Sequence, residues 1–190
     1  MNQSDSSTSR QGIGLPIAGF SLPLARNQEL AANVTLEEVL AGRKGALVVF
    51  WSGICAHCVR YDEYFNSFAA THPDVGFAAI ASRLNETQAQ MRQAIEERHL
   101  GFPVLLDADG AVARQFYAQQ TPRCYLISAE RTLIYRGAID NFKMPGDPEY
   151  LEYLEPAIRS FLAGEPVARP ETASFGCAIA NVYYQLPKQL

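Results

Sequence analysis

Long apolar runs and basic clusters are both missing from this sequence. No stretch approaches the roughly 20 consecutive apolar residues that a helix needs to cross a bilayer, so no membrane contact is expected. The 16 lysines and arginines are outnumbered by 20 aspartates and glutamates, which gives a net charge of -4, and they form no basic run. Nucleic acid is therefore not an expected partner.

Cysteine is also scarce, with four in 190 residues, which excludes a small disulfide-stabilised scaffold. The polar, serine-rich residues 1–10 contain no apolar segment of the kind found in secretory signals. We therefore expect the chain to act in the reducing cytoplasm, where two neighbouring cysteines are more often catalytic than structural. We expect residues 1–12 to be a disordered tail, residues 13–165 to form one domain, and residues 166–190 to be an extension packed on that domain.

Two of the cysteines, Cys55 and Cys58, stand two residues apart, directly after the uniformly apolar stretch 46–51. This stretch is typical of a buried strand, and the residues after it have a helical pattern. A cysteine at the start of a helix meets unsatisfied N–H groups and the positive end of the dipole, which favour its thiolate. We expect Cys55 to be the reactive, solvent-reachable thiol and Cys58 to be more buried.

Half of a zinc site and two inert buried thiols are the alternatives for this pair. A structural zinc site needs four ligands, and the other cysteines, Cys124 and Cys177, are isolated and have no neighbouring histidine. Redox chemistry without a metal or an organic cofactor is therefore favoured. Cys124 is expected to be a buried strand thiol. Cys177 could act as a resolving thiol only if the C-terminal extension folds back, which the sequence leaves open.

Strand and helix patterns alternate along the rest of the chain. Strands are predicted at 20–22, 46–51, 75–81, 103–106, 124–127 and 132–135, and helices at 35–40 (capped by Thr35), 55–70, 85–98 (capped by Ser82 or Asn85), 111–117 and 147–164. Asp147–Pro148 should open the last helix, Pro156 should kink it, and Gly164 should end it. This order predicts an α/β fold with a central mixed sheet, helices on both faces, and an antiparallel hairpin at one side.

The segment Gln120-Thr121-Pro122, just before the strand at 124–127, adds a further signal. Together with the strand order and the Cys-x-x-Cys motif it resembles the thioredoxin fold. The resemblance implies that the Thr121–Pro122 peptide bond is cis and that Pro122 packs against the cysteine pair. It also implies that the backbone of Thr121 faces the sulfurs, where it can pair with an extended substrate strand.

Several short motifs are similar to those of the redoxin group, which comprises the alkyl hydroperoxide reductase/thiol-specific antioxidant family and its TlpA-like relatives. Phe20-Ser21-Leu22-Pro23 resembles the opening of this group, and Phe102 to Asp107 resembles its "FPvllD" segment. The stretch Tyr135 to Asp140, followed by Gly164 to Val167 and by Thr172 to Ile179 with Gly176-Cys177, resembles the ending of a peroxiredoxin-like subgroup. The resemblance implies that residues 13–165 are a thioredoxin-like domain.

Three positions around the pair differ from the patterns of related families. Val48 stands where a peroxiredoxin carries a proline of its peroxide pocket, although Ser52 matches the threonine or serine of that pocket. Val49 stands where thioredoxin has a buried aspartate. Glu86 falls near the glutamate of TlpA-like proteins, which implies a role in relaying protons to Cys58. The alternative for Glu86 is an ordinary acidic residue in the first turn of a helix.

His57 lies between the two cysteines, as in DsbA-like oxidants. Its imidazole would stabilise the Cys55 thiolate by charge or hydrogen bonding, which makes the pair more oxidising. The alternative is an exposed histidine without such an effect. Trp51 is expected to pack beside the pair, with a purely structural role in the core as its alternative.

These observations predict a thiol–disulfide oxidoreductase. Cys55 would attack a disulfide of a protein or a small molecule, and Cys58 would resolve the mixed disulfide. One alternative is a thiol-dependent peroxidase, in which Cys55 reacts with a peroxide to give a sulfenic acid. A second alternative is a redox-sensing binding module. The sequence does not indicate an oligomeric state.

Overall fold

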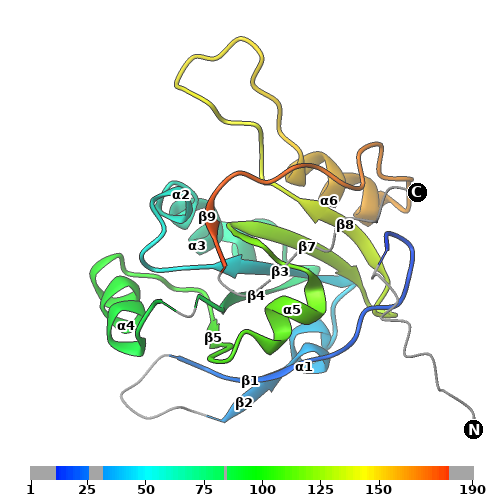
Figure 1. The fold of residues 1–190 in the computed structure, drawn as a ribbon. Coiled ribbons are helices and arrows are strands. Elements are labelled where there is room, and N and C mark those ends of the chain that lie inside the picture. Colours follow the sequence, from blue (N-terminus) through cyan, green and yellow to red (C-terminus); the bar gives the residue numbers. More distant parts are fainter. Residues whose placement is uncertain (1–11, 26–31, 84, 180–190) are drawn as a thin grey trace, which may run out of the picture.

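A five-stranded mixed sheet forms the centre of the computed structural model, which describes residues 12–25, 32–83 and 85–179 (Figure 1). The strand order is β5-β4-β3-β7-β8, with β3, β4 and β5 parallel to one another and β7 and β8 antiparallel to their neighbours. The strands are β3 (Gly45–Trp51), β4 (Val75–Ala81), β5 (Val104–Leu106), β7 (Arg123–Ser128) and β8 (Leu133–Gly137). The expected mixed α/β architecture is confirmed.

Helices cover both faces of this sheet, as predicted (Figure 1). They are α1 (Leu36–Leu40), α2 (Ala56–Val59), α3 (Asp62–Thr71), α4 (Gln88–Glu97), α5 (Ala111–Phe116) and α6 (Leu154–Ala163). Apolar side chains of α3, α4 and α6 pack on one face, and those of α1 and α5 pack on the other. Every residue of β3 is buried because this strand is covered on both sides.

Two small antiparallel sheets lie outside the main one. The first pairs β1 (Ser21–Pro23) with β2 (Asn33–Thr35). The predicted strand at 20–22 is therefore largely β1. The bridge between Leu24 and Leu105 and a hydrogen bond of 2.8 Å from the N–H of Ala25 to the carbonyl oxygen of Val104 join this region to the edge of the main sheet. The second pairs β6 (Gln120–Thr121) with β9 (Cys177–Ala178), which brings the C-terminal segment to the loop before β7 (Figure 1).

Three predicted helices differ from those observed. The single helix expected at 55–70 is divided into α2 and α3, because the backbone leaves helical geometry at Tyr61 (φ -104°, ψ 5°) and α3 begins at Asp62. Helix α4 is capped by Thr87, not by Ser82 or Asn85. Thr87 and Gln90 form a reciprocal capping box, which satisfies two backbone donors at the helix start.

The expected start of the last helix at Asp147–Pro148 is wrong. Residues 141–153 form a projecting loop instead, and α6 begins at Leu154 (Figure 1). Pro156 therefore lies in the first turn of α6, where its missing N–H leaves no helical hydrogen bond unmade, so the predicted kink has no cause. Gly164 ends α6 with a φ of 73°, as predicted.

The predicted disordered tail at 1–12 lies almost wholly outside the described residues, as does the end of the predicted extension beyond residue 179. Within the described part of the chain, no helix is long and apolar enough to cross a membrane.

Candidate active site

The two cysteines of the motif lie where β3 passes into α2. Cys55 is the N-cap residue of α2, and its carbonyl oxygen accepts a hydrogen bond of 2.9 Å from the N–H of Cys58. Both residues are thiols in this structure. The apolar run of β3 thus ends at the point where a helix presents two sulfur atoms, one turn apart.

The protonation states of the two thiols are strongly divided. A hydrogen bond from the Cys58 thiol, followed by contacts with Cys177 and the Thr121 side chain, lowers the pKa of Cys55 to about 4. Burial, followed by the interaction with Cys55, raises the pKa of Cys58. Near neutral pH the pair therefore consists of a thiolate at Cys55 and a thiol at Cys58. This is the arrangement of a nucleophile next to a proton-bearing partner.

The expectation that Cys55 is open to solvent is wrong for this conformation. Neither Cys55 nor Cys58 has any exposed surface. The C-terminal strand β9 pairs with β6 beside Cys55, so that Cys177 stands opposite Thr121, the residue whose carbonyl oxygen Cys55 contacts. The sequence alone could not place this strand, because the pairing of β6 with β9 joins segments far apart in the chain.

The Thr121–Pro122 peptide bond is cis, as the resemblance implied. The buried Thr121 belongs to β6, and its carbonyl oxygen accepts a hydrogen bond of 3.2 Å from the thiol of Cys55. The backbone of Thr121 therefore faces the active-site sulfur. Pro122 borders a neighbouring cavity together with His57.

The loop between β3 and Cys55 is held from two sides. Glu86 accepts a hydrogen bond of 2.6 Å from the N–H of Gly53, and Arg98 donates one of 2.8 Å to the carbonyl oxygen of Gly53. Burial raises the pKa of Glu86. Arg98 also forms an ion pair with Asp62, whose carboxylate accepts a 3.4 Å hydrogen bond from the indole N–H of Trp51. Trp51 is fully buried in the core cluster that contains both cysteines.

His57 and Cys124 differ in their access to the site. His57 is exposed on α2, and the groups that lower the pKa of Cys55 are the neighbouring thiols and Thr121. Cys124 is fully buried in β7, opposite Val49 of β3, and burial raises the pKa of its thiol. The expectation of a buried strand thiol at Cys124 is therefore confirmed.

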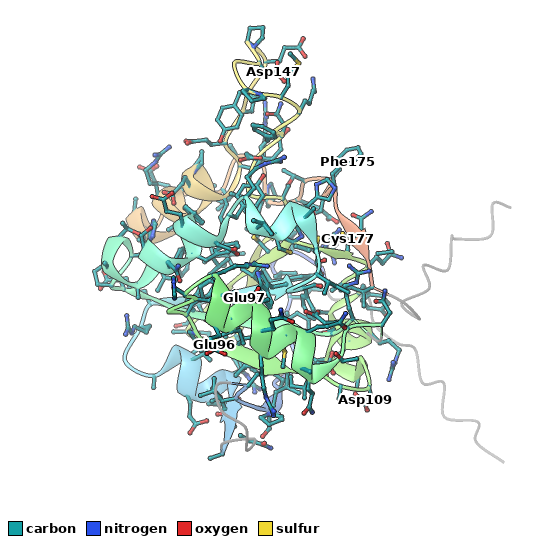
Figure 2. The ribbon with its side chains drawn as sticks, turned by 90° about the vertical axis from the view of Figure 1, so that its left-hand side faces the viewer. Glu96, Glu97, Asp109, Asp147, Phe175 and Cys177 are labelled. Atoms are coloured by element: carbon teal, nitrogen blue, oxygen red, sulfur yellow. The ribbon has the colours of Figure 1, made fainter. Side chains whose placement is uncertain are left out.

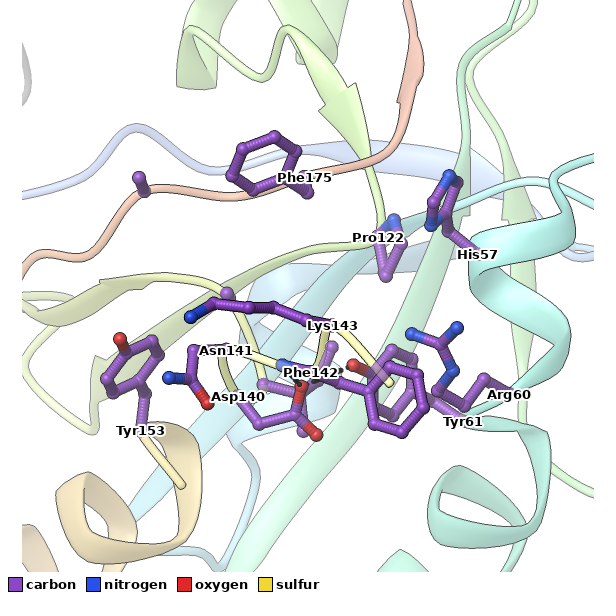
Figure 3. A pocket seen from close by; sticks show the side chains of 13 residues that line it. His57, Arg60, Tyr61, Pro122, Asp140, Asn141, Phe142, Lys143, Tyr153 and Phe175 are labelled. Atoms are coloured by element: carbon purple, nitrogen blue, oxygen red, sulfur yellow. Dashed lines mark hydrogen bonds between the residues drawn. The ribbon is translucent and has the colours of Figure 1, made fainter. Parts of the chain in front are cut away.

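A cavity of about 480 Å³ lies beside the site, between α2, the start of the projecting loop and the C-terminal segment (Figure 3). Its lining includes His57, Arg60, Tyr61, Pro122, Asp140, Phe142, Lys143, Tyr153 and Phe175. The guanidinium of Arg60 lies 3.7 Å from the ring centre of Phe142, and the hydroxyl of Tyr61 donates a 2.6 Å hydrogen bond to Asp140. This cavity was not recognisable in the sequence, because residues from five separate stretches of the chain line it.

The described residues contain no group of three histidine, cysteine or acidic side chains arranged to hold a metal ion. The site brings together the thiols of Cys55 and Cys58, and β9 adds Cys177 beside Thr121. Cys55, Cys58 and the backbone of Thr121 lie together, and Glu86 contacts the loop after β3, in which Trp51 is buried. Cys177, whose position the sequence left open, and Gly176 join the site because the C-terminal segment folds back and β9 pairs with β6.

Comparisons with known proteins agree with this arrangement. The AhpC/TSA family model matches residues 13–136. The thiol-disulfide oxidoreductase ResA of Oceanobacillus iheyensis is 29% identical over 115 residues, which are 60% of this chain and 58% of that protein. The chain thus spans little more than half the length of this curated relative.

Two solved structures resemble almost the whole chain. One is a hypothetical protein from Sinorhizobium meliloti, with a TM-score of 0.76 and a sequence identity of 29%. The match covers 88% of this chain and 93% of that protein's chain. The other is an uncharacterised conserved protein from Geobacillus kaustophilus, with a TM-score of 0.77 and a sequence identity of 23%. This match covers 90% of this chain and 93% of that protein's chain. Together with the strand order and the cis-proline, these similarities establish the thioredoxin fold.

Proposed function

Because the chain belongs to the AhpC/TSA family, we propose that it is a thiol–disulfide oxidoreductase whose redox pair is Cys55 and Cys58. The observation that carries this proposal is the geometry of the pair: Cys55 is the N-cap of α2, Cys58 lies one turn further, and the sulfur of Cys55 contacts the carbonyl oxygen of Thr121 before the cis-proline. In this arrangement the pKa of Cys55 is lowered and that of Cys58 is raised. A thiolate is the nucleophile in disulfide exchange. The relative named above is itself called a thiol-disulfide oxidoreductase.

The reaction proceeds in two exchanges. The Cys55 thiolate attacks one sulfur of a substrate disulfide, so that a mixed disulfide forms and the other substrate sulfur leaves as a thiolate. Cys58 then loses its proton and attacks the sulfur of Cys55, which releases the second substrate thiolate and leaves Cys55 and Cys58 joined. Two electrons pass from the pair to the substrate, and the reverse sequence oxidises a dithiol.

The second exchange requires a group that accepts the proton of Cys58. We assign this role to Glu86, because its raised pKa brings a buried carboxylate closer to the range in which it can take up a proton. Its carboxylate accepts a hydrogen bond from the N–H of Gly53, so Glu86, which precedes α4, contacts the loop that leads into Cys55. We assign to His57 a smaller influence on the Cys55 thiolate, from its position between the two cysteines on α2.

The substrate class is a disulfide of a protein or of a small molecule. The cavity bordered by His57 and Pro122 offers room for the groups that flank such a disulfide. The peroxidase alternative is disfavoured, because Val48, buried in the middle of β3, stands where a peroxiredoxin carries a proline of its peroxide pocket.

Two assays on one preparation test the proposal: reduction of insulin disulfides in the presence of dithiothreitol, and consumption of hydrogen peroxide. We expect insulin reduction by the parent protein, its loss in C55S, and its retention in C124S, which removes a thiol from the same core without touching the pair. Peroxide consumption without insulin reduction would instead support the peroxidase. If the folded protein shows neither activity, the redox-sensing binding module is the alternative that the result supports.

A further inference from the structure

The C-terminal segment crosses the active site as an extended strand. Strand β9 pairs antiparallel with β6, with Cys177 opposite Thr121 and Ala178 opposite Gln120. The pairing continues in a hydrogen bond of 2.8 Å from the N–H of Ile179 to the carbonyl oxygen of Gln119. The segment therefore lies along the two residues that precede the cis-proline, which is the backbone that faces Cys55.

Glycine at position 176 permits this close approach. A Cβ atom added to Gly176 would overlap the carbonyl oxygen of Thr121. Any other residue would therefore push β9 away from β6. The next residue, Cys177, is thus delivered to the site by a backbone contact that only glycine allows.

The segment is also anchored before it reaches the site. The N–H of Thr172 donates a hydrogen bond of 3.1 Å to the carbonyl oxygen of Arg136, and the Thr172 hydroxyl accepts one of 3.0 Å from the N–H of Ala138. An ion pair of 2.7 Å joins Arg136 to Glu171. From this anchor beside β8, residues 173–176 carry the chain across to β9 (Figure 1).

Cys177 stands opposite Thr121, whose carbonyl oxygen accepts the hydrogen bond from Cys55, and the side chains of Cys177 and Cys55 shift each other's pKa. Burial, and then Cys55 itself, raise the pKa of Cys177, whereas the guanidinium of Arg83 acts in the opposite direction. Cys177 thus remains protonated beside the Cys55 thiolate, with a cation nearby that can stabilise its own thiolate.

Cys177 is also the most exposed of the three cysteines. Cys177 is partly exposed, whereas Cys55 and Cys58 are fully covered. The neighbouring Phe175 has 86% of its surface exposed (Figure 2), and it stands over the cavity near Pro122 and His57 (Figure 3). A partner that approaches the closed site therefore meets Cys177 first.

We propose that Cys177 is a third redox cysteine, and that β9 acts as an internal substrate strand that exchanges a disulfide with Cys55. The proposal rests on the proposed function, because it uses the disulfide between Cys55 and Cys58. It extends that function by a relay: the buried pair communicates with outside thiols and disulfides through Cys177.

The exchange is balanced without an added oxidant or reductant. Cys177 loses its proton, and its thiolate attacks the sulfur of Cys55 in the oxidised pair. A bond forms between Cys55 and Cys177, the bond between Cys55 and Cys58 breaks, and Cys58 leaves as a thiolate that takes up the proton. One disulfide and one thiol are present before and after the step.

The first experiment traps the internal disulfide in C58S. The protein is treated with oxidised glutathione, its free thiols are blocked with N-ethylmaleimide, and the disulfides are mapped by mass spectrometry after digestion. We expect a disulfide between Cys55 and Cys177 in C58S and also in C58S/C124S, the matched control. In C58S/C177S we expect glutathione to remain on Cys55. Glutathione on Cys55 of C58S, with Cys177 free, would overturn the proposal.

The single variant C177S separates this proposal from the proposed function. If C177S still forms the disulfide between Cys55 and Cys58, but C58S forms no disulfide between Cys55 and Cys177, the relay proposal is wrong and the proposed redox pair stands. If C177S forms no disulfide between Cys55 and Cys58, the proposed redox pair itself is wrong.

A second experiment does not depend on the folding of C58S. G176A should lift β9 from Thr121, and iodoacetamide should then label Cys55 several-fold faster than in the parent protein. G101A is the matched control, because a Cβ there meets only Asn66 at 3.6 Å, and its labelling rate should be unchanged. An unchanged rate in G176A would show that β9 does not control access to Cys55, and would overturn the internal-strand proposal.

Discussion

A hydrogen bond of 3.2 Å joins the thiol of Cys55, which donates, to the backbone carbonyl oxygen of Thr121. This bond exists only while Cys55 is protonated, since a thiolate has no proton to give. The thiolate must therefore be stabilised by other groups, and these are the thiol of Cys58 first, and then Cys177 and the Thr121 side chain. The C-terminal strand thus contributes to the acidity of the nucleophile as well as to its burial.

Replacing Cys177 with alanine should raise the pKa of Cys55 above about 4, because one of its hydrogen-bond donors is removed. The measurement is the rate of iodoacetamide labelling of Cys55 as a function of pH, whose midpoint reports the thiolate fraction. C124A is the control, because Cys124 is not among the groups that lower this pKa. A midpoint that is equal in C177A and the parent protein would contradict the prediction.

Replacing His57 with alanine should raise the same midpoint by less than C177A does. His57 is exposed, so water screens its charge, whereas Cys177 contacts the sulfur of Cys55 directly. Thiolate absorbance followed during a pH titration provides the measurement. If H57A has no effect at all, His57 has no role in tuning the thiolate and remains a residue of the cavity.

The stability of the reduced protein should depend on pH through Cys55. Between about pH 4 and the ordinary thiol pKa of about 8.5, the folded state holds a thiolate at Cys55, and the unfolded state holds a thiol. The unfolded state then binds more protons, so stability rises with pH, and this contribution is lost as the pH falls through about 4. Urea denaturation under reducing conditions, at several pH values, measures the effect.

C55S is the control for this dependence. The difference in unfolding free energy between the parent protein and C55S should grow with pH within that window. Above this pH range, the raised pKa of Cys58 makes stability fall as the pH rises, because the folded state keeps a proton that the unfolded state releases. A difference that is constant with pH would mean that the pKa of Cys55 is not lowered on folding.

Glu86 should have separable structural and catalytic effects. E86A leaves the N–H of Gly53 without its acceptor and should cost about 1–3 kcal/mol of stability. E86Q keeps a carbonyl acceptor at that place, so its stability should stay close to that of the parent protein, but it cannot take up a proton. We expect E86Q to slow the attack of Cys58, so that mixed disulfides accumulate. Parent-like resolution in E86Q would limit Glu86 to supporting the loop.

The ion pair between Asp62 and Arg98 should be worth more than an exposed pair. Arg98 donates hydrogen bonds of 2.7 and 2.8 Å to the Asp62 carboxylate, and both side chains are largely buried. D62A should therefore cost about 3 kcal/mol of stability. R131A, which removes the exposed pair with Glu37, should cost less than about 1 kcal/mol. Equal losses in the two variants, measured by urea denaturation, would contradict this ranking.

Elements with a strong local signal were predictable from the sequence. The capping box of Thr35 and Glu38 starts α1 as expected, because both partners lie within one helical turn. The apolar stretch 46–51 is the central strand β3, because a strand covered on both faces needs an apolar side chain at every position. Gly164 ends α6 because glycine tolerates a positive φ.

Elements whose limits depend on distant contacts were not predictable. Asp147–Pro148 has the local signal of a helix start, yet α6 begins only at Leu154, where its side chains reach the core. The break between α2 and α3 at Tyr61 has no glycine or proline to mark it in the sequence. A helix is stabilised mainly by the packing of its apolar face, and a local sequence does not say where that packing begins.

The candidate site divides in the same manner. The sequence by itself determined the cysteine pair, because the spacing of Cys55 and Cys58 and the strand before them are local, and it indicated Pro122 through a resemblance. Only the tertiary structure decided that Cys177 lies on Cys55 and closes the site. That contact depends on the pairing of β9 with β6, and the pairing depends on the absence of a side chain at Gly176. Strand pairing between distant segments is fixed by the packing of the whole domain, which is why a lone cysteine in the sequence gave no sign of it.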